Sequence, residues 1–308
     1  MVTMEIVQQI KQLQKEKNAS ILAHYYARPE VQDIADYIGD SLELSRKAGE
    51  TKADIIVFCG VHFMAETAAV ISPTKKVLIP VEGAGCSLAE SITSEQLTQW
   101  KEVNPQGIIV CYVNTSADVK ACSDICCTSA NALQIVESLP ADKKILFVPD
   151  NNLGAWVQMK TGREIELWPG NCCVHERITA EMVIARSEEY PDADILIHPE
   201  CKCSSDLQVA NMPNVFIYST SGILKHATES PKKQFVIGTE IEALYQIGKK
   251  NPSKEIIPIA KTMICGQMKK IHLEDVLEAL EKEQYEVTIP AAIRAKAWSP
   301  IRKMLEMI

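Results

Sequence analysis

The chain has 308 residues, of which 46% are hydrophobic, which is enough to bury a large core in two or three compact units. Its formal net charge of -8 comes without a basic run, which argues against nucleic acid or an anionic membrane surface as the main partner. No apolar stretch approaches the length of about 18 residues that a membrane span needs. We therefore expect a cytoplasmic protein that acts on small molecules.

The first predicted element is an amphipathic helix in the segment MVTMEIVQQIKQLQKEKN (1–18). Ile6, Ile10 and Leu13 fall on one face of it among charged residues, and the segment lacks the apolar core of a secretory signal. The eleven cysteines are therefore expected in a reducing compartment, where disulfides are rare. Cys59 and Cys111 lie inside strand-like runs and are expected to be buried free thiols.

Three strand candidates share a pattern of three apolar residues, a polar residue, a spacer and a second polar residue. They are ILAHYY (21–26), IVCYVN (109–114) and ILIHPE (195–200), and their first polar positions lie 88 and 86 residues apart. Because side chains alternate along a strand, the two polar residues of each copy point the same way. The pairs are His24 and Tyr26, Tyr112 and Asn114, and His198 and Glu200.

After each of these strands the sequence predicts a helix that starts near a hydroxyl-bearing residue. Ser41 and Ser129 both lie 17 residues after the first polar position of their copy, and the third copy reaches Ser219, Thr220 and Ser221. We expect a hydroxyl to act as the N-cap of each helix. Free amides and the dipole at helix starts attract anions, so three of them suit a substrate with several carboxylates or a phosphate.

Each copy continues with a second strand, a turn and helix, a closing strand and then a cysteine. The second strands are DIIVFCG (54–60), KILFVPD (144–150) and QFVIGTE (234–240), and the closing strands are KVLIP (76–80), EIELWPG (164–170) and EIIPIA (255–260). The cysteines are Cys86, then Cys172 or Cys173, which the spacing does not separate, and Cys265. Strands that alternate with helices of this length predict βαβ units with parallel sheets.

The sequence therefore predicts an α/β fold of three pseudo-threefold-related α/β/α domains, each with three layers and a parallel sheet. We place them at 1–90, 91–175 and 176–308, the last with additional C-terminal helices. Sites in parallel sheets form at the carboxyl ends of the strands, so the polar pairs and the cysteines are expected at the central junction. Three separated thiolates do not match a closed zinc site. On a four-iron cluster they would leave one iron open to act as a Lewis acid.

A set of motifs gives the chain a specific resemblance to a known family. ILAHYYARPEVQDIADYIGDSLELSRKA (21–48), GCSLA (85–89), YVNTSADVKA (112–121), CCVHERIT (172–179), HPEC (198–201), STSG (219–222) and CGQMKKIHLEDVLEAL (265–280) together resemble quinolinate synthase. The resemblance implies a transferase with an oxygen-sensitive 4Fe-4S cluster. It implies that iminosuccinate condenses with dihydroxyacetone phosphate to give quinolinate, phosphate and two waters in de novo NAD biosynthesis. It also implies L-aspartate oxidase or aspartate dehydrogenase as the source of iminosuccinate.

The family pattern assigns roles to particular residues of this chain. It implies that the cluster ligands are Cys86, Cys172 and Cys265, and leaves Cys173 as a neighbour. It implies catalytic roles for Tyr26, Glu200, His24 and His198. It implies substrate contacts from His24, Ser41, Tyr112, Val113, Asn114, Ser129, His198, Pro199, Glu200 and Thr220. The segment before STSG is longer than the usual family spacing, so Ser219 and Ser221 are alternatives to Thr220. The remaining cysteines are expected to be buried or idle thiols: Cys122, Cys126, Cys127, Cys201 and Cys203.

Two alternative interpretations use the same residues. In one, the chain is an iron-sulfur sensor or electron carrier whose polar pairs are structural. In the other, Cys172 and His175 bind zinc in a hydrolase that uses Glu200 as its base. Zinc without acid-labile sulfide would favour the hydrolase, and an intact cluster without turnover would favour the sensor.

Overall fold

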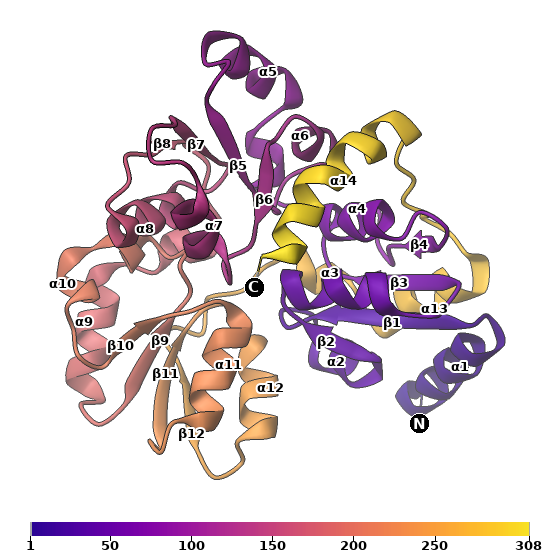
Figure 1. Ribbon diagram of the computed structural model, residues 1–308. Helices are drawn as coiled ribbons and strands as arrows, with labels where there is room; N and C mark the ends of the chain where they lie inside the picture. The colour runs from indigo at the N-terminus through magenta and orange to yellow at the C-terminus, as the bar shows by residue number, and fades with distance from the viewer. Residues whose placement is uncertain (1, 308) are drawn as a thin grey trace.

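The computed structural model describes residues 2–307 and contains three four-stranded sheets arranged around a common centre, with a triangular outline (Figure 1). The strand orders are β2-β1-β3-β4, β6-β5-β7-β8 and β10-β9-β11-β12, so the three sheets share one topology. All neighbouring strands are parallel. The predicted α/β class, with three repeated parallel sheets between layers of helices, is confirmed.

The first sheet and its helices lie within residues 2–91. The elements are α1 (Val2–Glu16), β1 (Ala19–His24), α2 (Pro29–Ile34), β2 (Tyr37–Gly39), α3 (Ser41–Glu50), β3 (Ile55–Cys59), α4 (His62–Ile71), β4 (Lys76–Leu78) and the 3-10 helix η1 (Ala89–Ser91). All five residues of β3 are buried, as expected for a parallel strand that helices cover on both faces. Ile10 of α1 is fully buried and Ile6 and Leu13 pack beside it, which confirms the predicted helical face.

The second and third sheets repeat this arrangement. The second unit contains α5 (Ser94–Val103), β5 (Ile108–Tyr112), α6 (Ala117–Ala121), β6 (Ile125–Cys127), α7 (Ala132–Ser138), β7 (Ile145–Val148), α8 (Asn151–Thr161), β8 (Glu166–Leu167) and η2 (His175–Arg177). The third contains α9 (Ala180–Glu189), β9 (Asp194–Ile197), η3 (Lys202–Ser205), α10 (Leu207–Ala210), β10 (Val215–Ile217), α11 (Thr220–Glu229), β11 (Gln234–Gly238), α12 (Ala243–Lys250), β12 (Glu255–Pro258) and η4 (Met268–Lys270).

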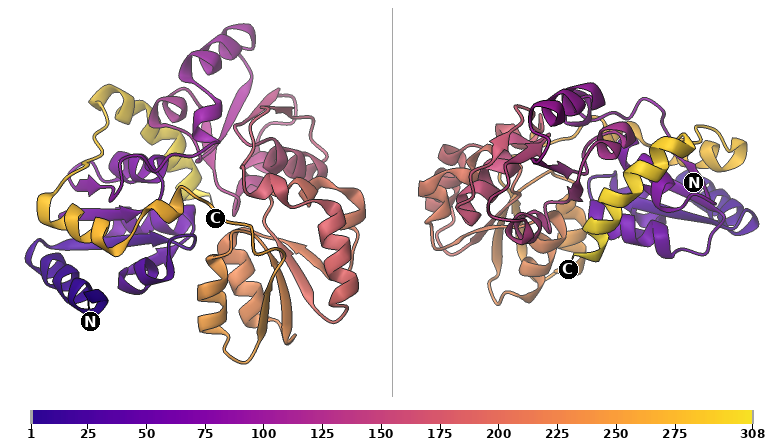
Figure 2. Two further views of the ribbon diagram at one scale, coloured as in Figure 1. Left: turned by 180° about the vertical axis from the view of Figure 1, so that it is seen from behind. Right: turned by 45° about the horizontal axis from the view of Figure 1, so that its top comes forward.

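Two C-terminal helices leave the third sheet and return to the other two. Helix α13 (Leu273–Lys282) packs against α1 and β3, on the face of the first sheet seen from behind in Figure 2. Helix α14 (Ala291–Glu306) packs against α6, β6 and α4, and so joins the first and second units (Figure 1). The proposed domain boundaries at residues 90 and 175 fall between the strands of successive sheets. Within residues 2–307 no helix is long and apolar enough to cross a bilayer.

The predicted hydroxyl N-caps are wrong for two of the three helices. Helix α3 begins at Ser41, but its cap is Asp40, whose carboxylate accepts from two amides and forms a capping box with Glu43. A carboxylate that accepts two amides satisfies more of the free helix start than one hydroxyl does. In the second unit the cap position of α7 is Asn131, two residues after Ser129. Of these three helices, only α11 has a hydroxyl cap, Ser219.

Candidate active site

The carboxyl ends of the central strands from all three sheets meet around one cavity. Twelve of the fourteen residues singled out in the sequence line it: His24, Tyr26, Ser41, Cys86, Tyr112, Asn114, Ser129, Cys172, His198, Glu200, Thr220 and Cys265. The other two, Val113 and Pro199, are buried next to lining residues but are not among the described residues that line the cavity. Residues that are up to 241 positions apart in the sequence, His24 and Cys265, therefore share one site.

The two histidines at the strand ends are held in the same way. The backbone amide of Tyr26 donates to Nδ1 of His24 at 3.1 Å, and the amide of Glu200 donates to Nδ1 of His198 at 3.4 Å. Each ring therefore carries its proton on Nε2, which in His198 donates to Ser129 Oγ at 3.1 Å. Burial lowers the pKa of His24 to about 4 and that of His198 to about 3. Both rings are neutral hydrogen-bond donors at pH 7.

Glu200 is a buried carboxylate with partners on both oxygens. His175 Nδ1 lies 2.7 Å from Oε2, and Asn114 Nδ2 donates to Oε1 at 3.2 Å. The Tyr112 hydroxyl also acts to lower the pKa of this carboxylate. Burial acts to raise the pKa of Glu200, but the charge and hydrogen bond of His175 outweigh it and lower the pKa to about 2. Glu200 is therefore ionised and placed to accept a proton.

Tyr26 connects the first sheet to the third through its hydroxyl. That hydroxyl lies 2.9 Å from Thr220 Oγ1 and 2.7 Å from Thr239 Oγ1. Thr239 Oγ1 is in turn 3.0 Å from Nε2 of His175, whose Nδ1 faces Glu200. Burial and the charge of Glu200 raise the pKa of Tyr26 well above its usual range. The phenol therefore stays protonated, at one end of a hydrogen-bonded chain that ends at the carboxylate.

The three cysteines predicted as ligands occupy equivalent turns. Each lies three residues before a 3-10 helix, η1, η2 or η4, and its carbonyl accepts from the amide four residues on. The amides two and three positions on are directed at each sulfur and act to lower its pKa; they are those of Leu88 and Ala89 for Cys86, Val174 and His175 for Cys172, and Gln267 and Met268 for Cys265. The same turn therefore presents one sulfur from each unit to the cavity.

The charge balance of these thiols suits a metal centre. Burial raises the pKa of Cys86 to about 12 and also raises the pKa values of Cys172 and Cys265, while the directed amides act in the opposite direction. Amides that point at a sulfur stabilise its thiolate, and a bound metal supplies the remaining compensation for burying the charge. The donor set therefore fits a thiolate-bound metal group. Cys173, by contrast, is exposed, and in this structure Cys172 is the residue held by the turn.

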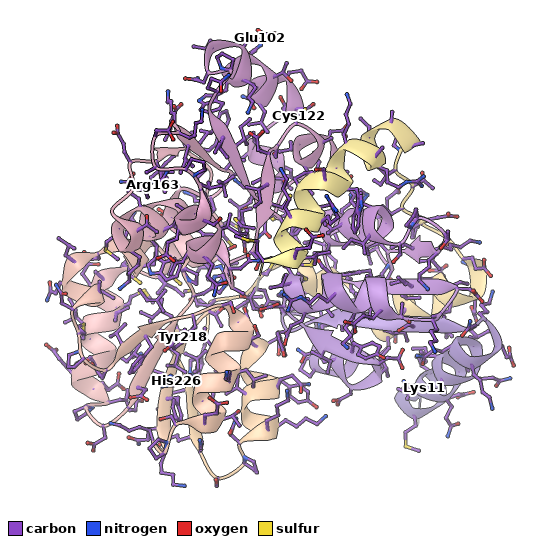
Figure 3. The ribbon with its side chains drawn as sticks, in the orientation of Figure 1. Lys11, Glu102, Cys122, Arg163, Tyr218 and His226 are labelled. Carbon is purple, nitrogen blue, oxygen red and sulfur yellow. The ribbon has the colours of Figure 1, made fainter. Side chains whose placement is uncertain are left out.

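Most of the other cysteines lie in the core, as expected. Cys59, Cys111, Cys126 and Cys127 are buried in strands, and Cys201 and Cys203 are buried after β9. Cys122 is half-buried at the end of α6, in the second unit (Figure 3).

The structure adds site residues that the sequence did not single out. Thr239 and Glu240 follow β11 and reach Tyr26 and the turn of Cys265. His175 was considered only as a zinc ligand, yet it is the partner of Glu200. Lys269 forms an ion pair with Glu240 at 2.6 Å. Thr239 and Glu240 could have been predicted from their position in the sequence, because polar residues directly after the second strand of a copy also reach the central junction.

Comparisons with known proteins identify the family. A family model described as quinolinate synthetase A protein matches residues 8–306. Quinolinate synthase from Pyrobaculum aerophilum is 48% identical over 303 residues, covering 97% of this chain and 98% of that protein. The enzymes of that name from Desulforudis audaxviator (46% over 303 residues; 98% of each chain) and, as quinolinate synthase 2, from Methanosarcina acetivorans (47% over 302 residues; 98% of this chain, 96% of the other) are similar to the same extent.

Likeness to solved structures is weaker. The E-1-hydroxy-2-methyl-but-2-enyl-4-diphosphate reductase from Plasmodium falciparum aligns over 91% of this chain and 94% of its own, with 14% identity and a TM-score of 0.30, which is too low to support an argument. The assignment comes from the sequence matches, which run through all three units and the cavity between them. The chain belongs to the quinolinate synthase family.

Proposed function

We propose that this chain condenses iminosuccinate with dihydroxyacetone phosphate to form quinolinate, phosphate and two waters, as a transferase of de novo NAD biosynthesis in the cytoplasm. The observation that carries the proposal is the single cavity lined by twelve of the residues that the family pattern selects. L-aspartate oxidase or aspartate dehydrogenase would supply the iminosuccinate.

The three equivalent cysteines are the proposed ligands of one 4Fe-4S cluster. Cys86, Cys172 and Cys265 line the same cavity, and two backbone amides are directed at each sulfur. Three protein ligands leave the fourth iron open, and a bound cluster would supply a Lewis acid for the departing hydroxyl groups. Substrate binding and proton transfer are assigned to the side chains around the cluster.

Neutral donors in the cavity suit the anionic groups of both substrates. The Nε2–H groups of His24 and His198 and the hydroxyls of Ser41, Ser129 and Thr220 can hold carboxylate and phosphate oxygens. Because Asp40 caps α3, the Ser41 hydroxyl is not used to satisfy the helix start. Asn114 Oδ1 is buried and has no hydrogen-bond partner among the described residues. It suits the N–H of an imine.

Proton transfer is assigned to the chain of groups between Glu200 and Tyr26. The ionised Glu200 carboxylate accepts the proton next to the ketose carbonyl, and the protonated Tyr26 donates to a leaving oxygen. His175 and Thr239 connect the two residues through contacts of 2.7 to 3.0 Å. A proton taken at Glu200 can therefore return to Tyr26 without passing through bulk water.

The first test is metal content and activity of anaerobically purified protein. We expect iron and acid-labile sulfide in a ratio near one and formation of quinolinate from the two substrates. Cys86→Ala, Cys172→Ala and Cys265→Ala should each lose the chromophore and activity, and Cys173→Ala is the matched control that keeps both. Zinc without sulfide, or a loaded Cys172→Ala protein beside a colourless Cys173→Ala protein, would overturn the ligand assignment.

The second test separates base from binding residue. Glu200→Gln keeps the shape of the side chain, so cluster content should survive while kcat falls roughly 100-fold or more, the usual contribution of a positioned acid-base group. His198→Ala should also raise KM, because it removes a contact made in the ground state. Near wild-type turnover of fully loaded Glu200→Gln would assign the proton transfer to another group.

A further inference from the structure

Three different donor atoms meet in the wall of the cavity, in a group that shares only Cys172 with the three predicted cluster ligands. Cys172 Sγ, His175 Nδ1 and a carboxylate oxygen of Glu200 all lie within 4.8 Å of one another. Nδ1 is 3.3 Å from the sulfur and 2.7 Å from Oε2. Among residues 2–307 this is the one group of three such donors that converges on a point.

The Sγ–Nδ1 separation matches the coordination sphere of a single transition metal ion, and the other two pairs of donors lie within reach of it. Bonds of about 2.3 Å to sulfur and about 2.0–2.1 Å to nitrogen and oxygen, in a tetrahedron, place the ligand atoms about 3.3–3.5 Å apart. The sulfur and Nδ1 already have this separation. Oxygen and Nδ1 would move apart by roughly half an ångström, which a χ rotation of the Glu200 carboxylate provides.

Each of the three donor groups also has a second polar partner that orients it, as the ligands of metal sites usually do. Nε2 of His175 faces Thr239 Oγ1 at 3.0 Å, which orients the ring so that Nδ1 points at Oε2 of Glu200, and a cation that binds at Nδ1 displaces the proton held there. Asn114 holds Oε1 of Glu200, which leaves Oε2 to face Nδ1. The amides of Val174 and His175 are directed at the Cys172 sulfur. These partners fix the orientation of the ligands before any metal arrives.

We propose that the cluster-free chain binds one divalent transition metal ion, of the zinc and ferrous iron class, through Cys172, His175 and Glu200, with water in the fourth position. One thiolate, one imidazole and one carboxylate form a borderline-soft set that suits these ions. On binding, the Cys172 thiol and the Nδ1–H group of His175 each release a proton. Because the cluster of the proposed function needs the same sulfur, the two occupancies exclude each other, and this last point rests on that function.

Cobalt titration of the full-length, cluster-free protein under anaerobic conditions tests the site. We expect one equivalent to bind with a thiolate-to-cobalt charge-transfer band and the visible bands of a tetrahedral ion. Cys172→Ala should lose the charge-transfer band. His175→Ala and Glu200→Gln should each weaken binding by at least about 100-fold, more than the loss of an outer-shell partner costs. His24→Ala is the matched control, a cavity histidine outside the set that should bind as the parent does.

The decisive variants are Cys86→Ala and Cys265→Ala, which cannot support the three-cysteine cluster. The proposal expects both to bind cobalt with the parent spectrum and stoichiometry. Loss of binding in either variant would place the ion on the cysteines and overturn the proposal. Absence of binding to folded parent protein, checked by circular dichroism, would overturn it as well.

A second measurement separates this proposal from the proposed function. Zinc added before iron and sulfide should slow cluster reconstitution in the parent protein, and less so in Glu200→Gln. If the parent forms a cluster and makes quinolinate but binds no cobalt, the mononuclear site alone is wrong. If cobalt binds as described but iron and sulfide never produce a cluster, the proposed function is wrong while the mononuclear site stands.

Discussion

The buried ion pair between Glu240 and Lys269 predicts a large loss of stability when only the lysine is removed. Lys269 Nζ lies 2.6 Å from Glu240 Oε1, and the two side chains are 13% and 0% exposed. The same ammonium donates to the carbonyl of Tyr26 at 2.6 Å. Glu240 also accepts from the amides of Cys265 at 3.1 Å and Glu242 at 2.8 Å. The pair therefore connects the first unit to the turn that holds Cys265.

Replacing Lys269 by Met leaves a buried carboxylate without a counter-ion. Breaking a buried pair in this way costs about 3–5 kcal/mol. Two amides still serve Glu240, which favours the lower end of that range, and the lost bond to Tyr26 adds about 1 kcal/mol. We expect a total near 4 kcal/mol in the free energy of unfolding. The double variant with Glu240→Gln removes the stranded charge and should recover at least about 1 kcal/mol of it.

The loss should also depend on pH. Burial raises the pKa of Glu240 and the charge of Lys269 opposes that rise, so without the lysine the folded-state pKa moves higher. An acid whose folded pKa exceeds its unfolded pKa stabilises the fold at low pH, and this contribution is lost as pH rises through the folded value. Lys269→Met should therefore lie closer to the parent at pH 5 than at pH 8.

Urea unfolding of the reduced, cluster-free full chain measures these differences, with tryptophan fluorescence and circular dichroism as two probes. Lys249→Met is the matched control, because Lys249 pairs with Asp33 at the surface and should leave the midpoint unchanged. A Lys269→Met protein within 1 kcal/mol of the parent at pH 8 would refute the reasoning. So would a double variant as unstable as the single one.

Three further predictions follow from local geometry. Because burial lowers the pKa of His24 to about 4 and of His198 to about 3, the fold should lose stability as pH falls below about 6.5. Urea midpoints at pH 7 and pH 5 should show this loss of stability. The double variant His24→Asn and His198→Asn should show a smaller loss. Gly170→Ala should lower the thermal midpoint, because its Cβ would overlap a backbone oxygen, whereas Gly248→Ala, in an open position of α12, should add about 0.5–1 kcal/mol to stability. Tyr26→Phe should lower kcat roughly 100-fold, and parent steady-state profiles should show no alkaline limb from Tyr26 below pH 10.

The repeated strands were readable from the sequence because fully buried parallel strands are continuous apolar runs with polar residues at their ends. The edge strands β2, β6 and β10 were not predicted, since each is only three residues long and shows no period. The packing of α13 and α14 on the first two units could not be predicted from local sequence patterns either. Their apolar faces are visible in the sequence, but the surface that receives them is not.

The candidate site, like the fold, could be predicted from the sequence only in part. Residues at the ends of strands were found because the pleat fixes their direction and the topology fixes their edge. The helix caps were assigned to hydroxyls because a hydroxyl recurs in each copy, while the stronger cap, Asp40, stands one position earlier. The pairing of His175 with Glu200 depends on how two units meet, which no periodicity encodes.

The distribution of one proposed ligand per unit has a consequence for biosynthesis. Cys265 follows Cys86 by about 180 residues, and at about 5–20 residues per second the ribosome needs roughly 10–40 s to add them. With the proposed ligand set, iron-sulfur delivery would therefore have to wait until Cys265 has been synthesised. The donors Cys172, His175 and Glu200 emerge about 65 residues before Cys265. A nascent chain would thus present the proposed single-ion site before the proposed cluster site is complete, and protection from free zinc during translation would then be part of making the proposed enzyme.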